Sequence, residues 1–368
     1  MNPGEIVLGR MPADLPDVLV DMALGSPAVT ALRTLHRLFS SSNGKVTKHH
    51  LRGGFEIAAA FQNLFNKPES ICAVRLACPT GDYWRQVLRY CADGCLQAVL
   101  DEFGHLTKEQ KRTLEATIAR LQETVNITAT SVNVDSLNSF LRGQPHKMRC
   151  HYAVDFGNQK LETEQGQKRA TSIRENFNSP FRPFVLATTS IGQEGLDFHQ
   201  YCRKIVHWNL PGNPIDLEQR EGRINRYKGL VIRQEVARKY GSQLPPGIGT
   251  TDPWDALFAL ADHAERAQRG KCELVPYWHV DAGEFKIERI IPLYPFSRDH
   301  GKLAAILKTL AIYRLAFGQP RQVELIEHLL QKNFTAEETE AIRRNLMIDL
   351  SPISYRRPSA AAVQSPIA

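Results

Sequence analysis

The sequence lacks the marks of a membrane or secreted protein. No apolar run approaches the length of about 18 residues that a bilayer-spanning helix needs, so we expect no membrane contact. The amino terminus has no basic region followed by an apolar core, which is the pattern of a signal peptide. The seven cysteines are an odd number, which argues against a secreted disulfide framework. These absences together predict a cytoplasmic protein.

The cysteines also lack the spacing of a zinc site. Four crowd together at Cys72, Cys78, Cys91 and Cys95, but they do not form the paired Cys-x-x-Cys pattern of a zinc ribbon. Cys91 and Cys95 lie four residues apart in a stretch with helical spacing. Buried, reduced thiols explain this group better than zinc does, and the sequence predicts no metal site.

The motifs that hold ATP are missing as well. A P-loop needs Gly-x-x-x-x-Gly-Lys-Ser/Thr, and neither Gly44-Lys45 nor Gly270-Lys271 meets this pattern. Residues 101–105 read Asp-Glu-Phe-Gly-His and imitate an Asp-Glu-x-His box, but the His is one residue late. Apolar residues upstream recur at helical spacing, so we expect a helix there and no Mg²⁺ site. The chain is therefore not expected to hydrolyse ATP by itself.

The composition is that of an ordinary globular protein with a basic bias. The 368 residues suggest about two domains, and the hydrophobic share of 42% and charged share of 23% are unremarkable for a soluble chain. The net charge of +7 permits nucleic-acid binding. Residues 203–239 hold nine Lys/Arg against four Asp/Glu, so the basic excess is strong there.

Apolar periodicity divides the chain into four regions. Residues 1–125 are predicted to be mainly helical, although residues 1–25 show no clear element; the expected helices cover residues 26–39, 55–65, 83–103 and 106–125. Residues 126–240 alternate strands with helices. The expected strands cover residues 128–134, 151–156, 184–187 and 203–208, and the expected helices cover 136–141 and 164–177. This alternation predicts an α/β fold with a parallel, doubly wound sheet.

The third and fourth regions extend this α/β lobe. Residues 241–350 are predicted to be mixed but mainly helical, with a loop at 241–253, a strand at 285–293 and helices at 255–268, 302–317, 323–331 and 336–347. Thr335 is the expected cap of the last helix. Residues 351–368 are rich in Pro, Ala and Ser and are predicted to be a disordered tail.

The first chemical motif follows the predicted strand at 184–187. Thr188, Thr189 and Ser190 come where the strand opens into a loop, at the carboxyl end where doubly wound sheets place ligands. Their short hydroxyls and the backbone N–H groups of the loop suit a phosphate of a nucleic-acid strand. Gly195 permits close approach of the backbone, and Asp197 adds an acid.

The second motif begins 22 residues beyond Asp197, with Gln219, and reads Gln-Arg-Glu-Gly-Arg-Ile-Asn-Arg through Arg226. Phosphoryl transfer needs cations on the γ-phosphate as charge spreads in the transition state. The arginine side chain suits this role because its fork is planar, always charged and bidentate to phosphate. The spacing of three between Arg223 and Arg226 predicts that both lie on one face of a helix.

Together the two stretches resemble motifs V and VI of superfamily 2 helicases and translocases, which lie on the second of two RecA-like lobes. The linking residues 209–218 look most like the Swi2/Snf2-related branch. That branch usually has Asp where this chain has Asn209, and Ile-Gly-Gln where this chain has Tyr-Lys-Gly at 227–229. The resemblance covers roughly residues 145–235.

The resemblance implies roles for individual residues. Arg223 and Arg226 would act as arginine fingers, and Gly222 would keep the backbone close to the nucleotide. Gln219 would hydrogen-bond across the interlobe cleft, and Arg220 would be structural. Gly195 and Asp197 would also contribute to nucleotide binding. Thr188, Thr189 and Ser190 would bind the nucleic acid.

The expected function is the carboxyl-terminal half of an ATP-dependent DNA helicase or translocase. ATP and Mg²⁺ would bind only with a complementary first lobe, which either acts in trans or has been lost by truncation. A non-enzymatic nucleic-acid or protein-binding module with a RecA-like fold is the alternative. A structural or regulatory helical protein with accidental motifs is a third. A P-loop and an Asp-Glu box in the neighbouring reading frame would favour the enzyme over the binding module.

Overall fold

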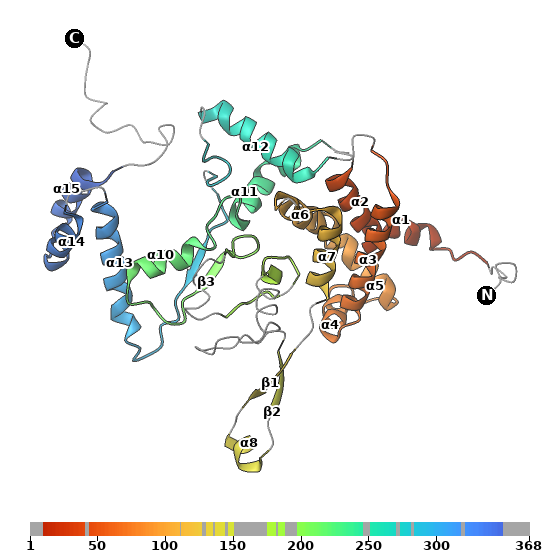
Figure 1. Ribbon diagram of the computed structural model, residues 1–368, viewed down its shortest axis with the longest axis horizontal. Coiled ribbons are helices and arrows are strands. Elements are labelled where there is room, and N and C mark those ends of the chain that lie inside the picture. The colour runs from red at the N-terminus through yellow and green to blue at the C-terminus, as the bar shows by residue number, and fades with distance from the viewer. Residues whose placement is uncertain are drawn as a thin grey trace, which may run out of the picture. The chain divides into compact units, whose positions relative to one another are not determined.

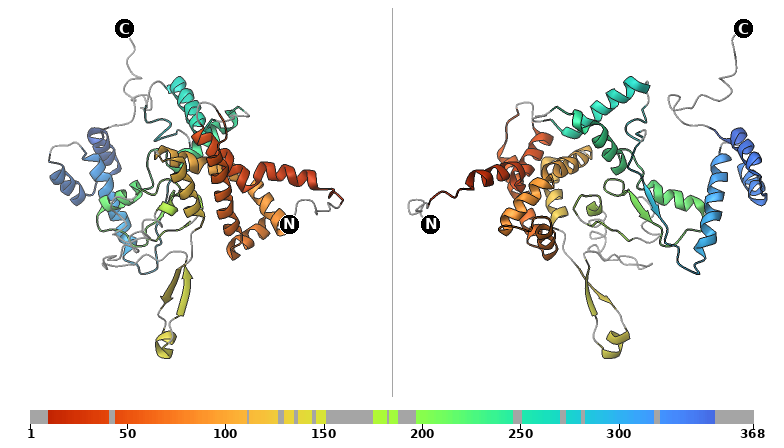
Figure 2. Two further views of the ribbon diagram at one scale, coloured as in Figure 1. Left: turned by 45° about the vertical axis from the view of Figure 1, so that its right-hand side comes forward. Right: turned by 180° about the vertical axis from the view of Figure 1, so that it is seen from behind.

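The computed structural model describes residues 10–40, 44–110, 112–126, 130–134, 137–143, 146–150, 175–181, 183–187, 197–245, 251–269, 273–280, 283–317 and 321–348. The chain divides into two compact units (Figures 1 and 2). The first, here called the helical unit, comprises Met1–Thr189 and Ser242–Phe258. The second, the motif unit, comprises Ser190–Gly241 and Ala259–Ala368.

The described part of the helical unit is built mainly from helices. They are α1 (Leu15–Gly25), α2 (Pro27–Phe39), α3 (Lys48–Phe65), α4 (Pro68–Ala77), α5 (Tyr83–Asp93), α6 (Leu96–Glu109) and α7 (Leu114–Val125). Helix α2 packs on α3 and α6, and α7 packs on α3 and α6, as the figures show. The core side chains are less than 2% exposed and include Leu35, Ile57, Phe61, Leu100 and Leu121. Burial of this apolar surface is the main stabilising term for the bundle.

Local signals account for the starts of two helices. Pro27 lies at the first position of α2, where its missing N–H costs nothing. Thr47 caps α3 and forms a reciprocal capping box with His50. The predicted helix at residues 26–39 is therefore confirmed, while α3 begins seven residues earlier than the predicted helix at 55–65.

Two of the predicted helices are divided differently in the structure. The helix expected over residues 83–103 is broken into α5 and α6 because Cys95 has a left-handed backbone, with a φ of 54°. The predicted start at residue 106 lies inside α6, and the next helix begins at Leu114, where the Thr113 side chain accepts from the Ala116 N–H at 3.2 Å. Helices α1 and α4 were not predicted.

The first two helices bear on the expectation about membranes. The stretch Leu15–Phe39 is long and apolar enough to cross a membrane by length and composition, so the expectation that no stretch reaches this limit is wrong. The stretch is nevertheless interrupted, because Ser26 has an extended backbone between α1 and α2. Helix α2 also buries Ala31, Leu35 and Leu38 in the bundle, as a core helix does.

The cysteines are only partly as predicted. Among the described residues the cysteines are unbonded thiols, but Cys91 alone is buried, and Cys72 and Cys95 are exposed. Burial raises the pKa of the Cys91 thiol to about 12. Cys91 is thus an inert core side chain of α5 at neutral pH.

A β-hairpin completes the described part of the helical unit. Strand β1 (Thr130–Val134) pairs antiparallel with β2 (His146–Cys150), and helix α8 (Leu137–Arg142) lies between them. The strand at 128–134 and the helix at 136–141 are confirmed, whereas β2 was not predicted. Further along, Arg120 is buried and donates to Asn176 Oδ1 at 2.9 Å, which ties residues 175–181 to α7.

The described residues of the motif unit contain one parallel strand pair. Strand β3 (Lys204–Val206) pairs in parallel with β4 (Glu288–Ile290), with Lys204 opposite Glu288. The other elements are α10 (Pro214–Gly222), α11 (Leu230–Tyr240), η3 (Gly241–Gln243), α12 (Pro253–Arg269), α13 (Asp299–Leu315), α14 (Gln322–Gln331) and α15 (Ala336–Leu346). Helix α12 begins in the helical unit and ends in the motif unit.

Two predicted strands and four predicted helices from residue 203 onward agree with the described ones. Strands β3 and β4 and helices α12 to α15 lie within one to four residues of the predicted positions. Thr335 caps α15 with the reciprocal contact from Glu338 that a capping box requires. The predicted tail at 351–368 lies outside the described residues.

The described strands of the motif unit give a parallel pair rather than the predicted doubly wound sheet. The parallel β3–β4 pair fits an α/β fold, but residues 184–187 do not form the expected strand: Phe184 and Val185 are 76% and 82% exposed. A strand needs a neighbour to satisfy its backbone, and no described segment pairs with residues 184–187. The predicted strand at 151–156 and nearly all of the helix at 164–177 lie outside the described residues.

Candidate functional site

The structure describes only some of the predicted site residues. Thr188, Thr189, Ser190 and Gly195 lie outside the described residues. The five that are described belong to the motif unit and are Asp197, Gln219, Gly222, Arg223 and Arg226.

Helix α10 positions the second motif. It begins at Pro214 because Asn213 caps it, with the Asn213 Oδ1 accepting from the Ile215 N–H at 3.0 Å. Leu217 anchors the helix: it is fully buried in a cluster with Leu210 and Ile306. Its last residue is Gly222, so the helix ends within the motif.

The expectation that Arg223 and Arg226 share one helix face is wrong. Arg223 caps α10, and the chain leaves the helix in a turn in which the Ile224 N–H donates to the Glu221 carbonyl at 3.1 Å. Glycine is a poor helix former, and the buried Ile224 side chain draws the chain inward after it. A spacing of three therefore does not place the two guanidinium groups in register.

The two motifs meet at Asp197 and Arg226. The Arg226 Nε donates to Asp197 Oδ1 at 3.1 Å, and both side chains are about half exposed. Within the described ranges, Asp197 is the ion-pair partner that the structure gives Arg226. The Nε contact restricts the orientation of the guanidinium plane.

Backbone contacts hold Asp197 in this position. The Phe198 N–H donates to the Arg223 carbonyl at 3.0 Å, and the Phe198 ring is buried. The Leu230 N–H donates to the His199 carbonyl at 2.8 Å. Arg233 is fully buried and donates to the carbonyls of Gln200 and Lys228. The end of the first motif is therefore fastened to the loop that carries Arg226.

Glu221, the acid inside the second motif, is engaged elsewhere. It accepts two hydrogen bonds from Arg289 on β4, one of them at 2.7 Å, and faces His207 Nε2 at 3.3 Å. Burial favours a higher pKa for Glu221, but Arg289 and His207 outweigh it and hold the pKa below its ordinary value. Burial lowers the pKa of His207, although Glu221 partly opposes this. Glu221 thus locks α10 to the sheet.

The remaining motif residues differ in how far the fold explains them. Arg220 donates to the Asn209 carbonyl at 3.2 Å, a structural contact as expected. Gln219 is exposed. A Cβ added to Gly222 would meet no atom within 4 Å, so the packing of the described residues does not require glycine at this position.

The comparison with protein families was decisive for this region. Residues 109–228 match the helicase conserved C-terminal domain. This confirms the resemblance to the second RecA-like lobe of a helicase, and the matched segment includes both motifs. No curated protein and no solved structure gave a match.

The helicase C-terminal segment covers 120 of the 368 residues, about a third of the chain. It starts at Glu109, the last residue of α6, and ends at Lys228, two residues after Arg226. It therefore includes α7 and the β1–β2 hairpin of the helical unit as well as α10 of the motif unit.

The basic excess around the second motif is smaller than the sequence indicates. Five of the nine basic residues in 203–239 pair with carboxylates: Arg203, Lys204, Arg226, Arg238 and Lys239. Arg233 is fully buried. The other basic residues of this stretch are Arg220, Arg223 and Lys228.

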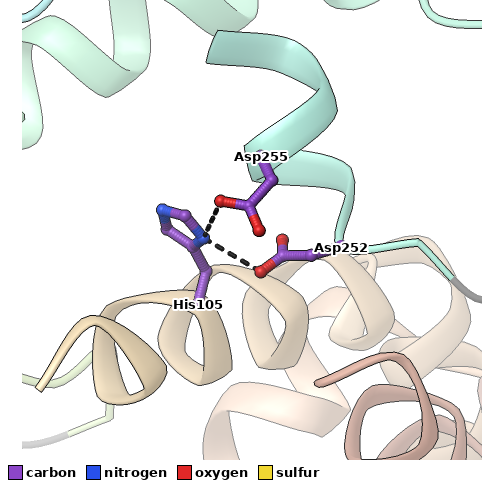
Figure 3. A group of neighbouring side chains, drawn as sticks. All are labelled: His105, Asp252 and Asp255. Atoms are coloured by element: carbon purple, nitrogen blue, oxygen red, sulfur yellow. Dashed lines mark hydrogen bonds and ion pairs between the residues drawn. The ribbon is translucent and has the colours of Figure 1, made fainter. Parts of the chain in front are cut away.

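A second group of ionisable side chains lies in the helical unit, outside the helicase C-terminal segment (Figure 3). The His105 Nδ1 lies 3.0 Å from Asp252 Oδ2 and 3.6 Å from Asp255 Oδ1, and His105 and Asp252 are buried. The donor types suit a cation, but the Lys108 ammonium lies 3.1 Å from Asp255 and already supplies positive charge.

Burial raises the pKa of Asp252, but His105, the Trp254 N–H and Lys108 together bring it below the ordinary value. This group therefore joins α6 to the start of α12 as an ionic link. Sequence reasoning missed it because 147 residues separate His105 from Asp252. The helix predicted over residues 101–105 is confirmed.

Proposed function

We propose that this chain is the carboxyl-terminal half of an ATP-dependent DNA helicase or translocase, with Arg223 and Arg226 as arginine fingers. The observation that carries the proposal is the contact between Asp197 and Arg226 at 3.1 Å, which joins the two motifs within a segment that matches a helicase domain. The Swi2/Snf2 branch, the doubly wound sheet and a cytoplasmic location belong to the same proposal.

The chemistry follows from how Arg226 is held. The Asp197 carboxylate accepts the hydrogen bond from Arg226 Nε. The two terminal nitrogens form the fork that would bind a phosphate. Such a fork can donate two hydrogen bonds to γ-phosphate oxygens as negative charge spreads over them. A lysine could supply the charge but not the paired donors.

The residues present suit a phosphate but do not form a complete nucleotide site. Gly222 lies four residues before Arg226, and its open surroundings would let a nucleotide approach the backbone. The sequence contains no P-loop lysine and no Asp-Glu box to hold Mg²⁺. ATP and Mg²⁺ would therefore be held by a complementary first lobe, and this chain would contribute the arginines.

The proposal is tested by measuring phosphate release from ATP with the purified chain, with and without DNA, and then with the complementary first lobe added. We expect background turnover from the chain alone and DNA-stimulated turnover after addition. Robust hydrolysis by the pure chain that Arg226→Ala abolishes would instead show a complete nucleotide site within it.

We also propose that the chain binds nucleic acid through phosphate contacts of Thr188, Thr189, Ser190 and the basic residues near Arg226. Such binding releases counterions, so affinity should fall steeply as salt rises, with a Kd of roughly 10⁻⁴ to 10⁻⁶ M at physiological salt. The non-enzymatic binding module is the second candidate, because residues 203–239 hold nine Lys/Arg against four Asp/Glu. Salt-dependent DNA binding that persists while no first lobe restores turnover would favour it.

A further inference from the structure

Three aromatic rings gather directly after the second motif. Tyr227 stacks on Tyr277, with ring centroids 5.5 Å apart and an angle of 22° between the planes. Trp278 meets Tyr227 edge to face at 6.0 Å. The Lys228 ammonium lies 5.6 Å from the Tyr227 centroid and 5.9 Å from that of Tyr277. We call these four residues the aromatic platform.

Backbone conformation and main-chain hydrogen bonds fix the positions of the platform residues. Lys228 has a left-handed conformation, with a φ of 48°, which is uncommon for a residue with a side chain. Its N–H donates to the Tyr277 carbonyl at 2.9 Å, and this bond fastens the turn after Arg226 to residues 274–278. The Trp278 N–H in turn donates to the Leu274 carbonyl at 2.7 Å. The rings are therefore held by main-chain contacts rather than by mutual packing alone.

Part of the aromatic surface of the platform is exposed. Tyr227 is 46% exposed and Trp278 is 45% exposed. Large aromatic surface held rigidly in water is costly, and clusters of it mark binding sites. A flat ring beside an ammonium matches a nucleotide of a single strand, since a base can stack on the ring while the cation meets its phosphate.

The motif unit has a second exposed aromatic pair, and it differs in one respect. Trp208 and Tyr294 meet edge to face at 5.9 Å and are 68% and 51% exposed. Among the residues that the structure describes, no lysine or arginine lies over either ring.

The acid near the aromatic platform is Asp262. It pairs with Arg266 at 2.7 Å, so the negative charge of Asp262 is largely compensated.

We propose that Tyr227 and Trp278 stack on the bases of a single-stranded nucleic acid, with Lys228 contacting the adjoining phosphate. The inference deepens the proposed nucleic-acid function and rests on it. Base stacking is tolerant of sequence, so no base preference is expected.

The test compares two fluorescently labelled oligonucleotides of equal charge by anisotropy at low salt: an oligothymidylate and an abasic strand of the same length. For Tyr227→Ala and Trp278→Ala we expect affinity for the oligothymidylate to fall by about tenfold or more, which is the range for base–aromatic stacking. Affinity for the abasic strand should stay unchanged. Tyr227→Phe and Trp278→Phe should bind nearly as the unmodified chain does, and Trp208→Ala is the matched control.

The outcomes separate this inference from the proposed function. Binding of both strands that neither alanine variant weakens would overturn base stacking while leaving nucleic-acid binding intact. Equal losses for the oligothymidylate and the abasic strand would overturn it too, because the effect would then be one of charge or folding. Failure of the unmodified chain to bind either strand would remove the proposed function itself. Displacement of the strand by ATP in a Trp278-dependent manner would reassign the platform to an adenine ring.

Discussion

The two units use their polar side chains in opposite directions. In the helical unit the Thr34 hydroxyl donates to the buried Asp101 at 2.6 Å, Arg37 pairs with the same carboxylate, and His105 meets Asp252. These groups face one another inside the bundle. In the motif unit Arg226 and the aromatic platform face water, although the unit has buried charges of its own, such as Arg233. The buried polar groups of the helical unit therefore stabilise the bundle, whereas the exposed groups of the motif unit can contact a ligand.

The largest expected effect lies at the two motif arginines, of which Arg226 is exposed and Arg223 is half-buried. With a complementary first lobe supplied, Arg223→Ala and Arg226→Ala should each lower the ATP turnover rate by about 10³-fold, which is the magnitude of an arginine finger. Arg226→Lys should rescue poorly because an ammonium lacks the fork. Steady-state phosphate release measures this. Arg314→Ala, at another exposed arginine of the motif unit, is the control; near-normal turnover by Arg226→Ala would contradict the assignment.

The next effect lies at the buried acid of the helical unit. Asp252→Asn should lower the free energy of unfolding by about 2 kcal/mol at neutral pH, because it weakens a buried, charge-assisted hydrogen bond to His105. The folded pKa of Asp252 is below its ordinary value of 3.8, so this stabilisation is present above that value and is lost as pH falls through the folded pKa.

Urea denaturation of the unmodified chain and the Asp252→Asn variant across the acid range should therefore show a difference that shrinks below about pH 4. Asp255→Asn, at a carboxylate that is 53% exposed, should change stability by less than about 1 kcal/mol. An equally large loss for both variants would contradict a special role for the buried pair.

A pair of glycines sharpens the comparison. A Cβ at Gly25 would lie 2.8 to 2.9 Å from the backbone and Cβ of Ala92, so Gly25→Ala should destabilise the helical unit by about 1–3 kcal/mol. Gly222→Ala meets nothing within 4 Å and should leave stability unchanged or raise it by up to about 1 kcal/mol. Thermal unfolding followed by circular dichroism distinguishes them. Gly222→Ala should nevertheless slow turnover with the first lobe present, if a nucleotide approaches there.

The smallest expected effect on stability is at Asp197. Its contact with Arg226 is between side chains that are both about half exposed, so Asp197→Ala should change the free energy of unfolding by less than about 1 kcal/mol. Turnover with the first lobe should fall, but less than for Arg226→Ala, because the guanidinium is kept and only its orientation is lost. A large loss of stability would mean that this pair supports the fold.

The features that the sequence predicted well depend on contacts between residues close together in the chain. Thr335 and Pro27 mark helix starts through contacts made within one turn, and α15 and α2 begin where these residues predict. Strands β3 and β4 were expected separately from their apolar patterns, but nothing local revealed that Lys204 lies opposite Glu288. The break at Cys95 was missed because a left-handed backbone at a non-glycine residue has little signature in a sequence.

The candidate site shows the same division. The order and spacing of the motifs sufficed to identify the helicase C-terminal segment. The helix expected under Arg223 and Arg226 was wrong because Gly222 ends it, and the strand at 184–187 was wrong because a strand depends on a neighbour supplied from elsewhere in the chain. The His105–Asp252 link and the aromatic platform were missed because each joins residues far apart in sequence.

The parallel pairing of β3 with β4 has a consequence for how the protein is made. Arg203 and its partner Glu288 are 85 residues apart, and Leu217 packs on Ile306 beyond the end of the helicase C-terminal segment. At a synthesis rate of about 5–20 residues per second, β3 waits on the order of ten seconds on the ribosome for its partner. Most of the helical bundle, whose helices precede residue 126, has left the ribosome earlier. The segment that carries the arginines thus stays without the partner of its strand until about 85 further residues have been made.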